Sequence, residues 1–190
     1  SNYGVVVCDD SGQIQSFQEK PKTEDALSQL VNTGIYIFEP EIVDLIPRGI
    51  DFDIGGELFP LILEKRLSFN AIKAPFNWID IGQLSDYWEA NQQMMRGKLR
   101  GVQMPGTEVR PKIWAGLNVK VDWDDVRIEG PVYIGSASHI ESGCQIYGPT
   151  WIGTGCHLES GAEISRSILF DYSRIGSSGE VTDSLVFGRN

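Results

Sequence analysis

An aliphatic residue returns at every sixth position through the C-terminal half of the chain, and this period constrains the fold more than any other feature. The register consists of Ile128, Ile134, Ile140, Ile146, Ile152, Leu158 and Ile164. A helix would return apolar residues after three and four positions and a strand after two, so short strands are compatible with a period of six. A fixed period of this kind predicts a repeat architecture in which successive units stack.

A second register lies four positions after each aliphatic residue and holds only small or apolar side chains. Its members are Val132, Ser138, Cys144, Thr150, Cys156, Ala162 and Ile168. Such side chains suit inward-facing positions near tight corners, where glycines relieve the backbone. The hexapeptide period belongs to parallel β-helices, and the two registers together resemble the left-handed parallel β-helix of hexapeptide-repeat proteins.

This resemblance implies that three hexapeptides form one coil, so that residues eighteen positions apart stack. It predicts the ladders Ile128/Ile146/Ile164, Ile134/Ile152/Phe170 and Ile140/Leu158. We expect residues 113–121 to cap the β-helix, and the segment around Ile175, Val181 and Val186 to continue it less regularly. The β-helix is also expected to mediate homo-oligomer contacts.

His139 and His157 are eighteen positions apart and are therefore predicted to stack on adjacent coils. The simplest interpretation is a polar ladder on the surface. A metal site or an acyltransferase site is the alternative, but no third ligand is evident from the sequence.

The segment ahead of the repeat has a different pattern, in which strand-like and helix-like stretches alternate. The predicted strands are "YGVVVCD", "GQIQSFQEKP", "VNTGIYIF", "LSFNAIKA" and "NWIDIG", and the third is dense enough in apolar residues to be a buried strand. The predicted helices are "EPEIVDLI", "GELFPLILEK" and "DYWEANQQMMRG", the last with Ser85 as its N-cap and Gly97 at its end. We therefore predict an α/β segment in residues 1–98, a linker in residues 99–112 that contains proline and glycine, and a β-helix in residues 113–190.

Charge and cysteine content limit the classes of partner and compartment. The net charge is −10, and acidic residues outnumber basic ones by five on each side of residue 112. The sequence contains no basic run, which argues against nucleic acid or an anionic membrane as partner, and no apolar run of membrane-spanning length. Three sparse cysteines indicate a reducing compartment, so we expect a cytoplasmic protein in which Cys144 and Cys156 act as small apolar residues without a disulfide.

Four short stretches of the α/β segment carry the chemistry. They are Tyr3–Gly4, Glu19–Pro21, Asn32–Gly34 and Trp78–Gly82. Each is weak alone, but their order and spacing closely resemble the sugar-phosphate half of the sugar-1-phosphate nucleotidylyltransferases. This resemblance implies a Rossmann-like nucleotidyltransferase domain, and many members of that family carry a left-handed β-helix behind it. The Asn-Thr-Gly stretch and the following "YIFEPE" look most like mannose-1-phosphate guanylyltransferases.

The resemblance implies a reaction in which a sugar 1-phosphate attacks the α-phosphorus of a nucleoside triphosphate, here GTP and mannose 1-phosphate, to give a nucleotide-sugar and pyrophosphate. Lys20 matches the position that binds the sugar phosphate, and an ammonium group suits that task. Glu19 matches the acceptor of sugar hydroxyls, and Gly4 matches a position whose backbone lies against the sugar. Asn32 and Thr33 match the strand edge beside the sugar.

The remaining positions concern the wall of the site and the metal. Gly34 matches a position that keeps the wall shallow, and Asp80 matches the aspartate that ligates Mg²⁺, a hard cation that prefers carboxylate oxygen. Lys20 and Asp80 are thus the predicted catalytic residues. Other interpretations are an exposed Glu19–Lys20 pair, a turn at Asp80 and a packing role for Trp78. Asp51 and Asp53 are interpreted as a helix cap rather than a metal site.

The sequence also departs from the family pattern. The glycine-rich nucleotide loop "GxGTRLxPLT" and the second metal-binding aspartate are not found ahead of Tyr3. We therefore expect the chain to correspond to the C-terminal half of such an enzyme and to be inactive by itself. The alternatives are a non-catalytic regulatory or assembly subunit built on the β-helix, and a hexapeptide-repeat acyltransferase that uses His139 or His157 as general base.

Overall fold

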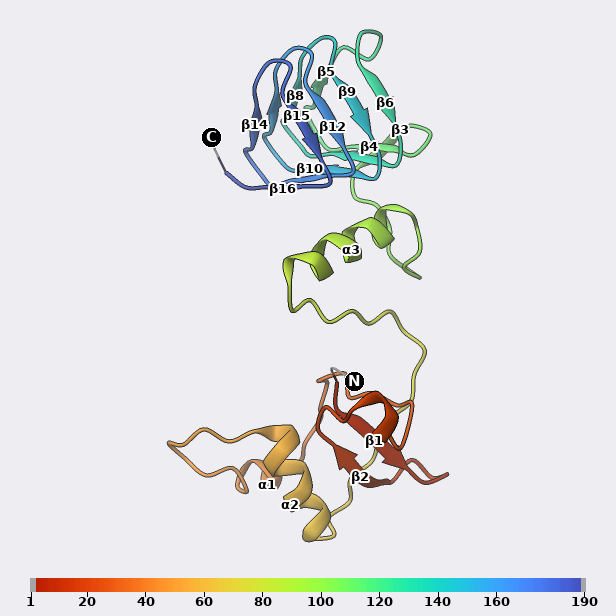
Figure 1. Ribbon diagram of the computed structural model, residues 1–190, viewed down its shortest axis with the longest axis vertical. Helices are drawn as coiled ribbons and strands as arrows, with labels where there is room; N and C mark the ends of the chain where they lie inside the picture. Colours follow the sequence, from red (N-terminus) through yellow and green to blue (C-terminus); the bar gives the residue numbers. More distant parts are fainter. Residues whose placement is uncertain (1–2, 189–190) are drawn as a thin grey trace. The chain divides into compact units, whose positions relative to one another are not determined.

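The chain forms two compact units in a computed structural model that describes residues 3–188 (Figure 1). The first unit comprises Ser1–Trp78 and the second Ile79–Asn190. The division falls ahead of the predicted linker, so the last helix of the α/β segment belongs to the same unit as the β-helix. Among the helices of residues 3–188, none has the length and apolar character needed to cross a membrane.

The first unit is built on an antiparallel hairpin. Strand β1 (Val5–Cys8) pairs with β2 (Ile14–Gln18), which confirms the first two predicted strands. The turn between them is closed by Asp9, whose carboxylate accepts hydrogen bonds from Ser11 and Gln13. Short helical segments follow, namely η1 (Thr23–Asp25), α1 (Pro40–Val43), η2 (Ile54–Leu58) and α2 (Phe59–Glu64).

Aromatic side chains form the core of this unit around helix α2. Phe59 is 2% exposed, and its ring contacts Phe17 of β2 at a centroid distance of 4.8 Å. It also contacts Tyr36 at 5.2 Å and Phe69 at 4.9 Å. Edge-on and tilted ring pairs of this kind add to the free energy gained by burying the rings. Helix α2 thereby holds β2, and with it the Glu-Lys-Pro motif, in place.

Three strand predictions for the first part of the chain are wrong. Residues 31–38, 67–74 and 77–82 are irregular, with isolated bridges at Val31 and Asn70 as the only pairing of these described residues. Ile35 and Ile37 are 71% and 97% exposed, whereas a buried strand was expected. Apolar and β-branched residues favour extended backbone, but a strand also needs a neighbouring backbone to pair with. Two of these segments meet a neighbouring backbone only briefly, around Val31 and Asn70, and these contacts are too short to form a strand.

The second unit is dominated by the β-helix, which confirms the predicted fold class. Its strands form three parallel sheets, with the orders β16-β13-β10-β7-β4, β14-β11-β8-β5 and β15-β12-β9-β6 (Figure 1). The first sheet is extended by β3 (Thr107–Arg110), which is antiparallel to β4. The other bounds are β4 (Ile113–Ala115), β5 (Lys120–Val121), β6 (Arg127–Glu129), β7 (Val132–Ile134), β8 (His139–Ile140), β9 (Gln145–Tyr147), β10 (Thr150–Ile152), β11 (His157–Leu158), β12 (Glu163–Ser165), β13 (Ile168–Leu169), β14 (Arg174–Ile175), β15 (Glu180–Thr182) and β16 (Leu185–Val186).

Two of the three predicted ladders are confirmed, and the third is confirmed in part. Ile128/Ile146/Ile164 and Ile140/Leu158 pair as expected. Ile134 pairs with Ile152, but the next rung is Leu169 instead of Phe170. The step from Ile152 to Leu169 is one residue shorter than the step from Ile134 to Ile152. A repeat that loses one residue at a corner shifts every later position by one.

The small-residue register is confirmed for its first six members, which are all buried. Ile168 is also buried, but it pairs with Trp151, so Ser167 takes the position that follows Thr150 in this register. Cys144 and Cys156 are buried free thiols, and burial raises the pKa of both.

The predicted cap is wrong in detail. Strands β4 and β5 pair with β7 and β8 as regular parallel strands, so residues 113–121 already belong to the first coil.

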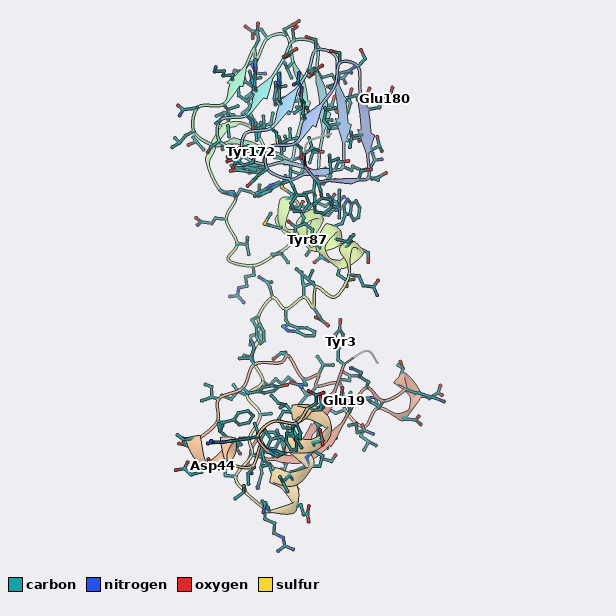
Figure 2. All side chains as sticks on the ribbon, turned by 90° about the vertical axis from the view of Figure 1, so that its left-hand side faces the viewer. Tyr3, Glu19, Asp44, Tyr87, Tyr172 and Glu180 are labelled. Carbon is teal, nitrogen blue, oxygen red and sulfur yellow. The ribbon has the colours of Figure 1, made fainter. Side chains whose placement is uncertain are left out.

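Helix α3 (Leu84–Met95) packs on the β-helix (Figure 1). Gln92 is fully buried and donates a hydrogen bond from Nε2 to the backbone oxygen of Pro149, 3.1 Å away. Trp88 donates from Nε1 to the backbone oxygen of Arg166 at 3.2 Å. Tyr87, labelled in Figure 2, stacks on Phe170 with ring centroids 5.7 Å apart.

The predicted N-cap of α3 is wrong, although its end is close to the prediction. Ser85 lies inside the helix, and Gln83 is the N-cap residue. The backbone N–H of Gln83 donates to the carboxylate of Asp86 at 3.0 Å. This hydrogen bond gives the N-cap backbone N–H a partner at the N-terminus of the helix. The helix ends before Gly97, whose φ of +69° is a conformation that glycine adopts without strain.

Candidate functional site in the first unit

Strand pairing in the hairpin brings two of the predicted site residues together. Val5 pairs with Gln18, so Gly4 and Glu19 extend the same pair of strands by one residue. Gly4 is buried, and a Cβ added there would lie 2.5 Å from Cζ of Phe17 and 3.3 Å from Oε2 of Glu19. The absence of a side chain at Gly4 is therefore what allows its backbone to approach Phe17 and Glu19.

The Asn-Thr-Gly segment lies on the other side of β1. The backbone N–H of Asn32 donates to the backbone oxygen of Gly4 at 2.8 Å. The Asn32 side chain is held from both ends, because Nδ2 donates to the hydroxyl of Tyr36 at 2.7 Å and Oδ1 accepts from the backbone N–H of Gly34 at 3.1 Å. Gly34 has φ +76° and open space around it, so this glycine is needed for its backbone conformation.

Trp78 ties this segment to the start of the chain. Its indole Nε1 donates to the backbone oxygen of Thr33 at 3.1 Å, and its ring meets Tyr3 edge-on with centroids 4.9 Å apart. Tyr3 and Glu19 are labelled in Figure 2. Gly4, Glu19, Asn32 and Thr33 are thus brought to one place by backbone pairing and by this tryptophan.

Lys20 follows Glu19 directly and faces solvent. Its Nζ lies 3.4 Å from Oε1 of Glu19, and the Lys20 side chain is 67% exposed. An exposed ion pair of this kind contributes little to stability, so the ammonium can exchange this contact for an anionic ligand at small cost. Lys20 has φ +43°, a conformation that is rare for a residue other than glycine and that occurs often at functional sites.

Gly55 lies beside this group and was not predicted from the sequence. A Cβ added to Gly55 would lie 2.7 Å from Oε2 of Glu19, so Gly55 also permits a close approach to that carboxylate. Asp53 is the N-cap of η2, with its side chain accepting from the backbone N–H of Gly56, which confirms the predicted helix cap. The signal for Gly55 was present in the double glycine of "DIGGELF", but nothing local connects it to Glu19.

Asp80 belongs to the second unit, in the extended segment that precedes α3. Its side chain is exposed. Within residues 3–188, neither a hydrogen bond nor an ion pair engages its carboxylate, so both oxygens are available to a ligand.

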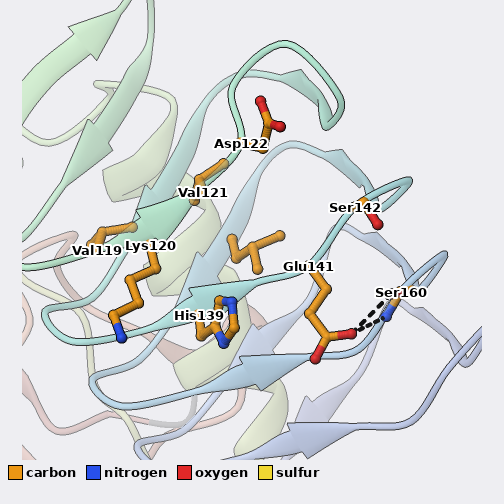
Figure 3. A pocket seen from close by; sticks show the side chains of 9 residues that line it. Val119, Lys120, Val121, Asp122, His139, Glu141, Ser142 and Ser160 are labelled. Carbon is orange, nitrogen blue, oxygen red and sulfur yellow. Dashed lines mark hydrogen bonds between the residues drawn. The ribbon is translucent and has the colours of Figure 1, made fainter.

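A separate pocket lies on the β-helix, and it contains none of the predicted substrate residues. It is shallow, with a volume of about 570 Å³, and its lining includes Lys120, Asp122, His139, Glu141 and Ser160 (Figure 3). The predicted stack is confirmed, with the His139 and His157 rings 5.0 Å apart and 10° from parallel. A third group, Glu141, stands beside them, which the sequence did not make evident.

Comparison with known proteins agrees with the two-part organisation. Residues 1–97 match the family described as Nucleotidyl transferase, and residues 123–166 match Bacterial transferase hexapeptide (six repeats). The chain therefore belongs to the nucleotidyl transferase family and carries hexapeptide repeats.

Similar curated proteins include three with different substrates in their names. A UTP–glucose-1-phosphate uridylyltransferase of Synechocystis sp. is 50% identical over 189 residues, which is 100% of this chain and 49% of that protein. A mannose-1-phosphate guanylyltransferase catalytic subunit beta of Drosophila pseudoobscura is 32% identical over 149 residues (77% of this chain, 34% of that protein). A glucose-1-phosphate adenylyltransferase of Acetivibrio thermocellus is 28% identical over 192 residues (98% and 40%). The chain thus spans half or less of the length of these relatives.

Proposed function

We propose that this chain supplies the sugar-phosphate-binding part and the β-helix of a sugar-1-phosphate nucleotidylyltransferase. The observation that carries the proposal is the close approach of Gly4, Glu19 and Asn32. Three separate stretches of sequence meet there through backbone pairing, and the glycine allows its backbone to approach Phe17 and the Glu19 carboxylate.

Each residue in the group has a task that suits its chemistry. The Lys20 ammonium binds the phosphate of the sugar 1-phosphate as a point charge. The Glu19 carboxylate accepts hydrogen bonds from sugar hydroxyls, and the segment from Asn32 to Gly34 forms the wall beside the sugar. The reaction needs positioning and charge neutralisation more than covalent chemistry, since both reactants are anions.

Asp80 is proposed to hold Mg²⁺. An exposed carboxylate without a protein partner is a suitable donor, and Mg²⁺ commonly takes one or two carboxylates and completes its shell with phosphate oxygens and water. When bound, the ion supplies positive charge against the phosphates. Lys20 and Asp80 remain the proposed catalytic residues.

Glucose 1-phosphate and UTP are the proposed substrates, in place of the mannose 1-phosphate and GTP expected from the sequence. The support is the 50% identity over the whole chain to the Synechocystis uridylyltransferase. Mannose 1-phosphate is the second candidate, supported by the 32% identity to the guanylyltransferase subunit.

Calorimetric titration of the chain with glucose 1-phosphate and with mannose 1-phosphate tests the proposal, with and without Mg²⁺. Lys20→Ala should weaken binding about tenfold or more, the usual scale for a charge-assisted hydrogen bond to phosphate. Lys22→Ala is the matched control, because it removes an exposed lysine two positions away and should bind like the unmodified chain. Equal binding by both variants would contradict the role of Lys20, and tighter binding of mannose 1-phosphate would reverse the substrate assignment.

The β-helix is proposed to mediate contacts between copies of the chain. Light scattering coupled to size-exclusion chromatography measures the mass in solution, and a monomeric mass at concentrations of about 100 µM, where weak association would be visible, would contradict this part of the proposal.

A further inference from the structure

One face of the β-helix carries a ladder of basic residues with acidic partners. Lys120, His139, His157 and Arg174 occupy equivalent positions on β5, β8, β11 and β14 and are adjacent rungs of one parallel sheet. An acidic residue follows two positions after each of the first three. Each of two such residues, Glu141 and Glu159, reaches forward to the basic residue of the next rung.

The rung formed by Glu159 and Arg174 is an ordinary surface ion pair. Oε1 of Glu159 accepts from Nε of Arg174 at 2.7 Å, while Oε2 accepts from the backbone N–H and the hydroxyl of Ser177, each at 3.0 Å. Five fixed guanidinium donors suit carboxylate recognition, and a guanidinium carries no acceptor lone pair for a metal ion. This rung therefore provides an internal reference for the one before it.

The rung formed by Glu141 and His157 has the same arrangement with different chemistry. Nε2 of His157 lies 2.7 Å from Oε1 of Glu141. Oε2 of Glu141 accepts from the backbone N–H and the hydroxyl of Ser160, each at 2.9 Å, and Figure 3 shows these two bonds. The Ser160 bonds fix the carboxylate plane. A second layer of hydrogen bonds that orients a carboxylate is typical of groups that bind metal ions.

His139 supplies a further donor beside this pair. Its ring is stacked on that of His157, it is exposed, and no hydrogen bond engages its ring nitrogens within residues 3–188. One ligand atom each from His139, Glu141 and His157 lie within 4.8 Å of one another. Two ligand atoms of a tetrahedral zinc site are about 3.4 Å apart for bonds of about 2.05 Å, so a tilt of the exposed His139 ring brings the three atoms together.

We propose that His139, Glu141 and His157 bind a divalent transition metal ion, with Zn²⁺ as the preferred ion. Two imidazoles and one carboxylate form a common three-ligand set for Zn²⁺. Mg²⁺ and Ca²⁺ prefer oxygen ligands to imidazole nitrogen. The ion joins β8 to β11 and so links two successive coils. Two of the three proposed ligands, His139 and Glu141, also line the shallow pocket beside Lys120 and Asp122.

Titration of the full chain with Zn²⁺ by calorimetry, and with Co²⁺ by visible absorption, tests this site. We expect one Zn²⁺ per chain at these residues, a tetrahedral Co²⁺ spectrum, and a higher melting temperature of the β-helix with Zn²⁺ present, because a ligand that binds only the folded state stabilises it. His157→Arg should remove this equivalent of metal while keeping the fold, because it recreates the neighbouring Glu159–Arg174 rung one coil earlier. His139→Asn and Glu141→Gln should each weaken binding about tenfold or more.

Glu159→Gln is the matched control. It changes the equivalent carboxylate one rung further on, away from the two histidines, and should leave Zn²⁺ affinity unchanged. Unchanged Zn²⁺ binding in His157→Arg would overturn the proposal, since the metal would then be bound elsewhere, for example at Cys8. The same holds if the unmodified chain shows no saturable binding of Zn²⁺, or if Glu159→Gln weakens binding as much as Glu141→Gln does.

Discussion

Replacement of Ile152 by alanine should destabilise the β-helix strongly. Ile152 is fully buried and stacks between Ile134 and Leu169 on the neighbouring coils. The substitution removes three carbon groups, each worth about 0.8 kcal/mol of burial, and leaves a cavity that rigid neighbouring coils fill only in part. We therefore expect a loss of about 3–4 kcal/mol in the free energy of unfolding, or about 10–15 °C in melting temperature for a unit of this size.

Thermal unfolding followed by circular dichroism measures this effect, with Leu117→Ala as the control. Leu117 belongs to the same unit and loses the same number of carbon atoms, but it is 79% exposed. Its replacement should change the free energy of unfolding by about 0.5 kcal/mol or less. Similar shifts for the two variants would refute the reasoning, because burial in the stacked ladder would then not determine the stability of the β-helix.

Three further predictions concern a glycine at a corner of the β-helix, the ion pair of Glu159 and the packing of helix α3. Gly153→Ala should lower the melting temperature of the β-helix, because the new Cβ would lie 2.7 Å from a backbone nitrogen of the next coil. Gly176 has open space around it, so Gly176→Ala should leave the melting temperature unchanged. Hydrogen bonds from Arg174 lower the pKa of Glu159, so its contribution to stability is present above the ordinary glutamate pKa of about 4.3 and is lost as the pH falls through the lower folded-state pKa. Melting temperatures measured from pH 6 to pH 3 should therefore fall less in Glu159→Gln than in the unmodified chain. Gln92→Ala should cost about 1–3 kcal/mol in denaturant unfolding, because a buried hydrogen bond is lost, and an unchanged unfolding midpoint would contradict the packing of α3.

The β-helix could be predicted from the sequence because its signal is local and repeated. Every coil repeats the same pattern, so the ladder through Ile146 and the small-residue positions up to Ala162 were predicted correctly. The error at Phe170 arose because the chain drops one residue near Arg166, and Leu169 and Phe170 are both apolar, so the pattern alone fits either register. A single deletion between similar residues leaves no trace in a hydrophobic period.

The first unit was harder to predict because strands depend on partners that local sequence does not reveal. The hairpin around Asp9 has turn chemistry between two apolar runs and was found. The segment around Ile37 has the composition of a buried strand and is exposed in an irregular stretch. The proximity of Gly4, Glu19 and Asn32 came from resemblance to a family, and Gly55 was missed because its closeness to Glu19 is purely tertiary.

The packing of helix α3 determines where the nucleotidyl transferase region and the β-helix can be recombined between related proteins. The match to the nucleotidyl transferase family extends to residue 97 and includes this helix, yet the buried side of the helix, with Gln92 and Trp88, is bonded to the β-helix. A chimera joined at residue 97 would set a foreign helix against the native β-helix and leave Pro149 and Arg166 without their donors. A crossover near residue 79 would transfer the helix together with the surface that it fits, so recombination there should yield folded hybrids more often.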